Sequence, residues 1–209
     1  MSGQQGFSNA DTGSKPADPF KEKNLEDDIS LETKIKDLSD FMQACKYGMM
    51  TTRDASSGNL VSRCMAIAAQ EKAGIDLLFH TNTESHKTDE LHNDPHINIS
   101  FINAKGEWAS INGIASVETG RELVRKYYSP DLKAWVGDLG DGKHDGGPED
   151  PRIGIIRVKT VTATYNLANK NILSRAADVA VGTVTGKTAV TNKLREISEQ
   201  EIKQWRSTH

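Results

Sequence analysis

Residues 47–91 read YGMMTTRDASSGNLVSRCMAIAAQEKAGIDLLFHTNTESHKTDEL, and they carry the clearest signal of the fold class. It holds three short apolar or β-favouring segments, separated by turn signals at 54–59 and 71–74. Short strands joined by such turns are typical of an antiparallel meander, because parallel neighbours need long crossover connections. The three predicted strands are YGMMTTR, NLVSRCMAIAA and IDLLFHT.

Three more strands are predicted further along the chain. HINISFIN alternates Ile97, Ile99 and Phe101 with polar residues, which is the pattern of a half-buried strand. GEWASINGIASVE and IGIIRVKTVTATY complete the set, and the last one shifts its alternation near Thr160, which predicts a β-bulge. Six strands in mostly hairpin order, with helices between them, predict a mainly β (α+β) fold built on a closed or partly closed antiparallel barrel.

Helical spacing and capping patterns mark the helices around this barrel. Residues 31–46 carry an apolar stripe at helical spacing, so we expect an amphipathic helix packed on the core. Capping signals predict three more helix starts, and the last of these helices bears Ile202 and Trp205. The three starts are Thr119-x-x-Glu122, Ser129-Pro130 and Ser198-x-x-Glu201.

Composition excludes several classes of protein. The 209 residues carry 26 Lys plus Arg and 29 Asp plus Glu, a net charge of -3, so no basic footprint points to nucleic acid. Two cysteines make neither a zinc set nor a disulfide framework. No apolar run is long enough to span a bilayer, and the N-terminus has no secretory h-region. We expect a cytoplasmic protein that binds neither nucleic acid nor membrane.

The chain divides into three predicted parts. Residues 1–28 are polar and rich in Gly, Ser, Asp and Pro, so we expect a disordered or extended tail. Residues 29–170 contain all six strands and form the barrel domain. Residues 171–209 form a C-terminal extension that ends in a helix, and we expect it to pack on the barrel or on a partner subunit.

One constellation predicts an anion site. Arg63 lies in an otherwise apolar strand, where an unpaired charge is costly. Ser85 is a good N-cap, and Lys87 occupies the first helical turn, where a cation opposes the helix dipole. A phosphate bound at this N-terminus would use the backbone N–H groups, the Ser85 hydroxyl and both cations. The alternative is that Arg63 pairs with a surface carboxylate while Lys87 is only solvated.

Four histidines between residues 80 and 96 raise the question of a metal site. His92 and His96 flank Asn93-Asp94-Pro95, a helix stop, so they do not share a helical face. No cysteine or carboxylate completes a familiar ligand set around them. We expect no metal.

In this order, the motifs of the chain resemble the pyridoxamine 5'-phosphate oxidase-like superfamily of flavin-binding split barrels. The resemblance covers about residues 31–166 and is greatest to the general stress protein branch and the related fungal blue-light-inducible proteins. It rests on Ser62-Arg63-x-Met65, on Phe79-His80-Thr81-Asn82-x-x-Ser85-x-Lys87, on Trp108-x-x-Ile111-x-Gly113, on Trp135 and on Asp150-Pro151 before IGIIRV.

The resemblance implies a six-stranded split barrel that forms a homodimer with flavin at the interface. The cofactor would be FMN, with FAD as the alternative. Its phosphate would lie on Arg63, Ser85 and Lys87, and its ring and ribityl chain would run along Met65, His80 and Thr81. The residues expected at the cofactor are Arg63, Cys64, Met65, His80, Thr81, Ser85, His86, Lys87, Trp108, Ser110 and Trp135.

The sequence departs from the pyridoxamine-phosphate oxidases themselves after the last predicted strand. Asn166 stands where the family pattern has a Trp, and no substrate-binding Arg-Leu-His segment follows. We therefore expect a flavin-dependent oxidoreductase acting on an unknown small redox partner rather than an enzyme of vitamin synthesis. No nucleophile or general acid stands out, although His80 could donate a proton near the ring. The alternative is a flavin-binding stress or light-response protein without turnover.

Overall fold

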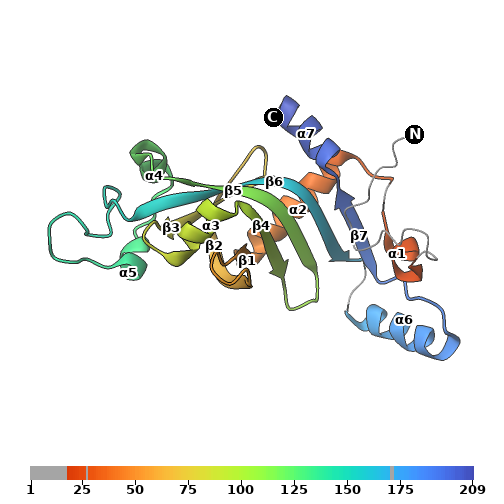
Figure 1. The fold of residues 1–209 in the computed structure, drawn as a ribbon. Coiled ribbons are helices and arrows are strands. Elements are labelled where there is room, and N and C mark those ends of the chain that lie inside the picture. Colours follow the sequence, from red (N-terminus) through yellow and green to blue (C-terminus); the bar gives the residue numbers. More distant parts are fainter. Residues whose placement is uncertain (1–17, 27, 170–171) are drawn as a thin grey trace.

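The computed structural model describes residues 18–26, 28–169 and 172–209 (Figure 1). Most of the predicted tail lies outside the described residues. Within the described ranges, no helix is both long and apolar enough to cross a membrane. The elements are α1 (Pro19–Asn24), α2 (Leu31–Cys45), β1 (Tyr47–Arg53), β2 (Leu60–Glu71), β3 (Asp76–Asn82), α3 (His86–Asn93), β4 (His96–Ile102), β5 (Trp108–Glu118), α4 (Arg121–Tyr127), α5 (Leu132–Val136), β6 (Ile153–Ala168), α6 (Ile172–Thr185), β7 (Asn192–Ile197) and α7 (Glu199–Thr208).

The prediction of an antiparallel split barrel is confirmed. The sheet runs β3-β2-β1-β4-β5-β6-β7, and β3 also pairs with β6, so the first six strands close on themselves. The barrel is closed by antiparallel pairing of β3 with β6, from Leu77 opposite Val158 to Asn82 opposite Ile153. The predicted bulge is present, because the β5–β6 register shifts between Asn112 and Gly113, opposite Thr160–Thr162.

The barrel interior and α2 share one apolar core. Ser30 caps α2 by accepting a hydrogen bond from the Thr33 N–H, and the apolar stripe then enters the core, where Ile35 and Leu38 are at most 2% exposed. The facing strand residues are the inward members of each alternating pattern, as the period of two requires. They include Met50, Leu77, Phe79, Ile99, Phe101, Ile111, Ile156 and Val158.

A second, smaller apolar cluster covers the outer side of β3 and β6. Leu78, Ile153 and Ile155 pack there against Val124 of α4. The two predicted helix starts in this region were wrong by one and two residues. Gly120 is the N-cap of α4 and makes no side-chain cap, so Thr119 caps nothing. Helix α5 begins at Leu132 after Asp131, because Ser129-Pro130 is used in a turn in which the Leu132 N–H donates to the Ser129 carbonyl.

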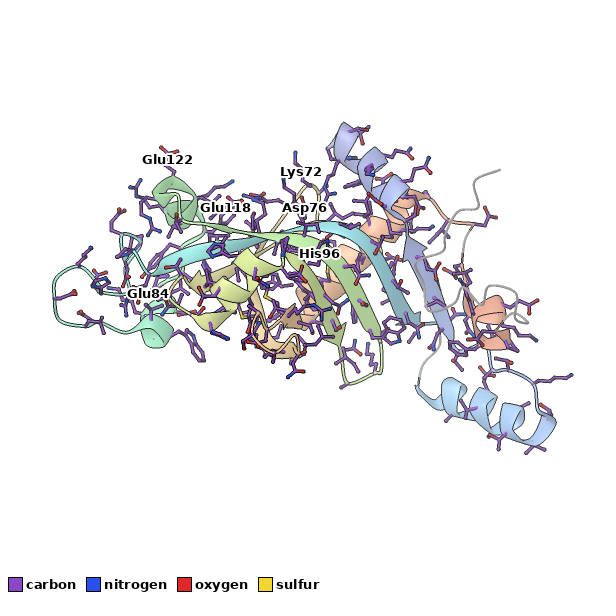
Figure 2. All side chains as sticks on the ribbon, viewed as in Figure 1. Lys72, Asp76, Glu84, His96, Glu118 and Glu122 are labelled. Atoms are coloured by element: carbon purple, nitrogen blue, oxygen red, sulfur yellow. The ribbon has the colours of Figure 1, made fainter. Side chains whose placement is uncertain are left out.

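The C-terminal extension adds a strand that was not predicted. β7 pairs with the second half of β6, from Ala163 to Ala168. The predicted capping box of Ser198 and Glu201 then opens α7, which buries Ile202. Helix α7 lies over the β2–β3 turn, where Figure 2 labels Lys72 and Asp76; the Trp205 indole N–H donates to the Lys72 carbonyl at 3.0 Å.

The end of the predicted tail is ordered against this extension. Residues 19–24 form helix α1, which Asp18 caps by accepting from the Phe20 N–H at 2.9 Å. Leu25 forms a parallel bridge with Leu194 of β7. The buried Arg195 guanidinium binds Glu26 and Asp37, which links the tail, β7 and α2. The last part of residues 1–28 is therefore tied to the barrel.

Candidate functional site

The N-terminus of α3 is not capped by a side chain. Ser85 has the extended backbone of an N-cap, but its hydroxyl accepts no hydrogen bond from a backbone N–H of the first turn. Instead it donates to the Asn82 carbonyl at 2.6 Å and accepts from the Lys87 ammonium at 2.8 Å. The first backbone N–H groups of an α-helix have no intrahelical acceptor, so this end of α3 presents donors and partial positive charge.

Arg63 reaches the same helix from β2. Its Nη2 donates to Glu90 Oε2 at 2.7 Å, and its Nη1 donates to Thr52 Oγ1 at 2.6 Å. The sequence left open whether Arg63 faces a phosphate or pairs with a surface carboxylate. The structure gives it a carboxylate, but a buried one: the Glu90 side chain is 2% exposed, while 23% of the Arg63 side chain is accessible.

The two cations influence each other. Burial lowers the pKa of Lys87, and the positive charge of Arg63 lowers it further. Like charges repel, so two cations held at one helix N-terminus are a poor arrangement for stability alone. An anion between them would remove that repulsion and accept from several donors at once. The structure therefore brings Arg63, Ser85 and Lys87 together, as the anion-site hypothesis requires.

His86 completes this end of the helix. Its Nε2 lies 3.0 Å from Asp54 Oδ2, and this contact is the main reason that the pKa of His86 is raised. Ligand-type atoms of Asp54, His86 and Glu90 all lie within 4.8 Å of one another. The guanidinium of Arg63 already neutralises the Glu90 carboxylate, so the cluster has the charge pattern of ion pairs rather than of a cation site.

Three other predicted cofactor residues lie on the outer face of the sheet. Side chains alternate along a strand, so Cys64 points away from the face that carries Arg63 and Met65. Cys64 pairs with the exposed Met49, and the same row continues through Ser100 to Ser110. Trp108, two residues from Ser110, points to the same side of β5.

His80 is held by the neighbouring helix. It lies on the side of β3 that α4 covers, and its Nε2 is 2.7 Å from the Tyr127 carbonyl oxygen. Burial lowers its pKa. A neutral imidazole that donates to a backbone carbonyl is a structural tie, so this geometry does not favour His80 as a proton donor. The next residue, Thr81, is buried, and Met65 packs against the main core.

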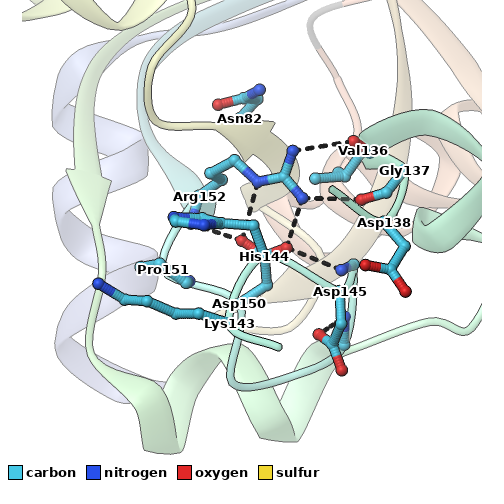
Figure 3. Close-up of polar contacts among 12 residues, drawn as sticks. Asn82, Val136, Gly137, Asp138, Lys143, His144, Asp145, Asp150, Pro151 and Arg152 are labelled. Atoms are coloured by element: carbon cyan, nitrogen blue, oxygen red, sulfur yellow. Dashed lines mark hydrogen bonds and ion pairs between the residues drawn. The ribbon is translucent and has the colours of Figure 1, made fainter. Parts of the chain in front are cut away.

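Trp135 projects from a firmly held segment. Its side chain lies on α5 and is 86% exposed. Just after it, the loop returns to β6 through Arg152, whose guanidinium donates to the carbonyls of Val136 and Gly137 and to both oxygens of Asp150 (Figure 3). The Arg152 carbonyl in turn accepts from the Thr83 N–H at 2.7 Å, which joins this loop to the turn before α3.

Sequence reasoning missed Glu90 and Thr52. Glu90 lies three residues after Lys87 and four after His86, a spacing that places all three near one another on the helix. Its position next to the buried Leu91 was the available signal, because a carboxylate beside the apolar face of a short helix needs a cationic partner. Thr52 carried no such signal.

Comparison with known structures supports the fold assignment. General stress protein 26 from Bacillus anthracis aligns with a TM-score of 0.51 at 22% identity, over 66% of this chain and 94% of that one. A pyridoxamine 5'-phosphate oxidase-related, FMN-binding protein from Nostoc punctiforme aligns at 0.52 and 12%, over 66% and 84%. A general stress FMN/FAD binding protein from Xanthomonas citri aligns at 0.52 and 18%, over 64% and 88%. At these identities the similarity establishes the fold.

Sequence comparison establishes the family. Protein bli-3 of Neurospora crassa is 66% identical over 210 residues, and the alignment covers 100% of both chains. Residues 33–190, which include α3, the whole barrel and part of the extension, match the family of pyridoxamine 5'-phosphate oxidase-like proteins. The chain therefore belongs to the pyridoxamine 5'-phosphate oxidase-like family.

Proposed function

We propose that this protein binds a flavin nucleotide, FMN in the first place, by its phosphate at the N-terminus of α3. The observation that carries the proposal is the convergence of Arg63 and Lys87 on a helix end without a side-chain cap. Related folds from Nostoc punctiforme and Xanthomonas citri are described as FMN or FMN/FAD binding, which agrees with this ligand class.

The donor set fits a terminal phosphate. A phosphate monoester carries close to two negative charges at neutral pH and has three acceptor oxygens. Arg63 offers a planar fork, Lys87 offers a point charge, and the helix end offers backbone N–H groups. FAD presents a diester with less charge at the same position, so a site with two cations favours FMN. The residues that the family resemblance places along the rest of the flavin are Met65, His80 and Thr81.

We further propose that the protein is a homodimer with the flavin at the interface. The outer sheet face exposes large apolar side chains: Tyr47 at 59%, Met49 at 42% and Ile102 at 73%. A contiguous exposed apolar face on a sheet marks an interaction surface, and closed twofold pairing would cover it together with Trp108 and Ser110. Trp135 would then approach the partner subunit.

Light scattering tests the dimer. We expect a mass near twice 22.9 kDa, and we expect Ile102→Glu to give a monomer because it places a charge on the proposed interface. Val184→Glu, on the similarly exposed Val184 of α6, is the matched control and should leave the dimer intact. A wild-type protein that remains monomeric at micromolar concentration would disprove the pairing.

We propose that the bound flavin makes the protein an oxidoreductase with a small-molecule partner, located in the cytoplasm. When bound, flavin supplies the electron-transfer chemistry, while this chain binds and orients it. A second candidate is a flavin-binding stress or light-response protein without turnover. The engagement of His80 by the Tyr127 carbonyl favours that candidate, because it removes the one proton donor expected beside the ring. Rapid bleaching of the flavin by NADH or NADPH supports the enzyme, whereas bleaching by dithionite alone supports the binding protein.

Titration with FMN and riboflavin tests the phosphate site itself. Arg63→Ala removes a charge-assisted contact of roughly 1.5–3 kcal/mol, so FMN should bind about 10- to 150-fold more weakly. Riboflavin has no phosphate and should bind wild type and variant equally. If Arg63→Ala binds FMN as tightly as wild type does, the site is assigned wrongly.

A further inference from the structure

Glu90 is a buried carboxylate at a site that is otherwise built for an anion. The residue is 1% exposed and lies four residues after the start of α3, within reach of Arg63. A negative charge there weakens the attraction of the site for phosphate, and burying a carboxylate costs free energy unless it is paired. Charge alone therefore does not explain why a carboxylate occupies this position.

The hydrogen bonds around Glu90 suggest what it does. Its Oε2 accepts from two donors on two different strands: the hydroxyl of Thr52 on β1 and Nη2 of Arg63 on β2. The Thr52 hydroxyl also accepts from Nη1 of Arg63 at 2.6 Å, which closes a triangle of side chains. Each terminal nitrogen of the Arg63 guanidinium thus donates to one acceptor, and these two hydrogen bonds together restrict the orientation of the group.

The arrangement leaves donors unused. A guanidinium has five N–H groups, and the contacts with Glu90 and Thr52 use one on each terminal nitrogen. Lys87, which lies three residues before Glu90 on α3, is hydrogen-bonded to Ser85 rather than to the Glu90 carboxylate. Glu90 therefore holds Arg63 in place and leaves Lys87 and part of Arg63 available to a ligand.

We propose that Glu90, together with Thr52, is a positioning residue of the phosphate site. It holds the Arg63 guanidinium in the orientation that a phosphate ester needs, at the expense of one unit of positive charge. The inference rests on the proposed flavin site and adds to it that binding depends on a pre-set arginine rather than on the number of positive charges. Pre-organisation of this kind strengthens binding because the side chain loses less entropy when the ligand arrives.

A role through charge and a role through positioning predict opposite changes in FMN affinity for Glu90→Gln. If charge dominates, removal of the carboxylate tightens FMN binding. If positioning dominates, FMN binding weakens by about 10-fold, the effect of impairing one charge-assisted hydrogen bond, and riboflavin binding does not change. Asp89→Asn is the matched control, because it removes the same charge from the adjacent, exposed position on α3. We expect the control to bind FMN within about 2-fold of wild type.

Thr52 gives an independent test that leaves the ionic groups unchanged. Thr52→Val removes the hydroxyl that holds Nη1 and should weaken FMN binding in the same direction, whereas Thr52→Ser keeps the hydroxyl and should restore it. This pair keeps the inference testable if Glu90→Gln fails to fold. FMN binding by Thr52→Val that equals wild type, or an equal loss of FMN and riboflavin in Glu90→Gln, would overturn it.

Inorganic phosphate separates a failure of this inference from a failure of the flavin proposal. We would measure the rise in unfolding temperature with phosphate for wild type, Glu90→Gln and Asp89→Asn. A rise in wild type and in Asp89→Asn that is absent in Glu90→Gln supports the positioning role even if FMN does not bind. A rise of equal size in all three proteins overturns the positioning role. No rise in any of them, with no preference for FMN over riboflavin, overturns both proposals.

Discussion

The ion pairs Arg152–Asp150 and Arg63–Glu90 each join an arginine to a buried carboxylate, but the two guanidinium groups differ in exposure and in hydrogen bonding. Arg152 and Asp150 are 6% and 0% exposed, and the four hydrogen bonds of the guanidinium engage all three of its nitrogens. Arg63 and Glu90 are 23% and 2% exposed, and the guanidinium makes two hydrogen bonds. The Arg152 guanidinium uses four of its five N–H donors within its own chain, whereas the Arg63 guanidinium uses two.

The number of hydrogen bonds that each guanidinium makes distinguishes an arginine that stabilises the fold from one that can bind a ligand. Arg152 attaches the end of α5 to the start of β6, and every acceptor it uses lies within 16 residues in the sequence. Arg63 joins a strand to a helix 27 residues away, beside a second cation and an uncapped helix end. Unused N–H donors on an arginine that lies beside a second cation indicate a ligand-binding residue, whereas burial of the arginine alone does not.

Loss of the Arg152–Asp150 pair should have the largest effect on stability. Arg152→Ala leaves the fully buried Asp150 without its cation, and we expect the free energy of unfolding to fall by about 3–5 kcal/mol. Urea denaturation measures this loss. The ratio of FMN to riboflavin affinity should stay at its wild-type value, and a change in that ratio comparable to the change in Arg63→Ala would erase the distinction between the pairs.

The same pair should give a stability change in acid. Hydrogen bonds from Arg152 hold the pKa of Asp150 at about 2, below its ordinary value of 3.8. A carboxyl whose folded-state pKa is depressed stabilises the fold above its unfolded pKa and loses that contribution as pH falls through the folded pKa. Wild type should therefore be more stable than Asp150→Asn at pH 5, and the gap between their urea midpoints should shrink toward pH 2. A gap that does not depend on pH would contradict the assignment.

Lys87 should contribute less to FMN binding than Arg63. Lys87→Ala removes a point charge that opposes the helix dipole, so we expect a loss of about 3- to 10-fold for FMN and none for riboflavin. Burial and the positive charge of Arg63 lower the pKa of Lys87. As pH rises, the Lys87 ammonium therefore loses its proton before the pH reaches the ordinary lysine pKa of 10.5. The preference of wild type for FMN over riboflavin should decline as pH rises through that pKa. The decline should be absent in Lys87→Ala, and its persistence there would assign it to another group.

Trp135 should have the smallest effect on the isolated fold. Its side chain is 86% exposed, so Trp135→Ala should change the free energy of unfolding by no more than about 0.5 kcal/mol. If a partner subunit covers it, as we propose, the substitution should weaken the dimer in dilution experiments. A large loss of monomer stability would show that Trp135 packs within its own chain.

Local patterns in the sequence predicted most of the barrel. The alternation of Ile97, Ile99 and Phe101 and the phase shift near Thr160 are local signals, and both were correct. The strand β7 was missed because its contacts depend on where α1 and α2 sit: the buried Arg195 pairs with Glu26 and Asp37, which are more than 150 residues away.

The site was predictable in part for the same reason. Arg63 and Lys87 stood out because each is unfavourable in its own local setting, and a local rule can detect that. Glu90 and Thr52 were missed because their role is defined by contacts across 27 and 11 residues with Arg63. Cys64 was expected at the cofactor together with Arg63 and Met65, although strand alternation places it on the opposite face. The contact of His80 with Tyr127, 47 residues later, had no local signal.

The sixteen residues of β6 pair with β3 and β7 at their two ends and with β5 along most of their length. The barrel therefore closes only when residues 77–82 pair with residues 153–158. Contacts this distant in sequence slow folding, because the loop between them has to be ordered first. During synthesis, the first five strands emerge with β3 exposed as an open edge, and such edges promote aggregation. We expect refolding to be slow and its yield to fall steeply with protein concentration.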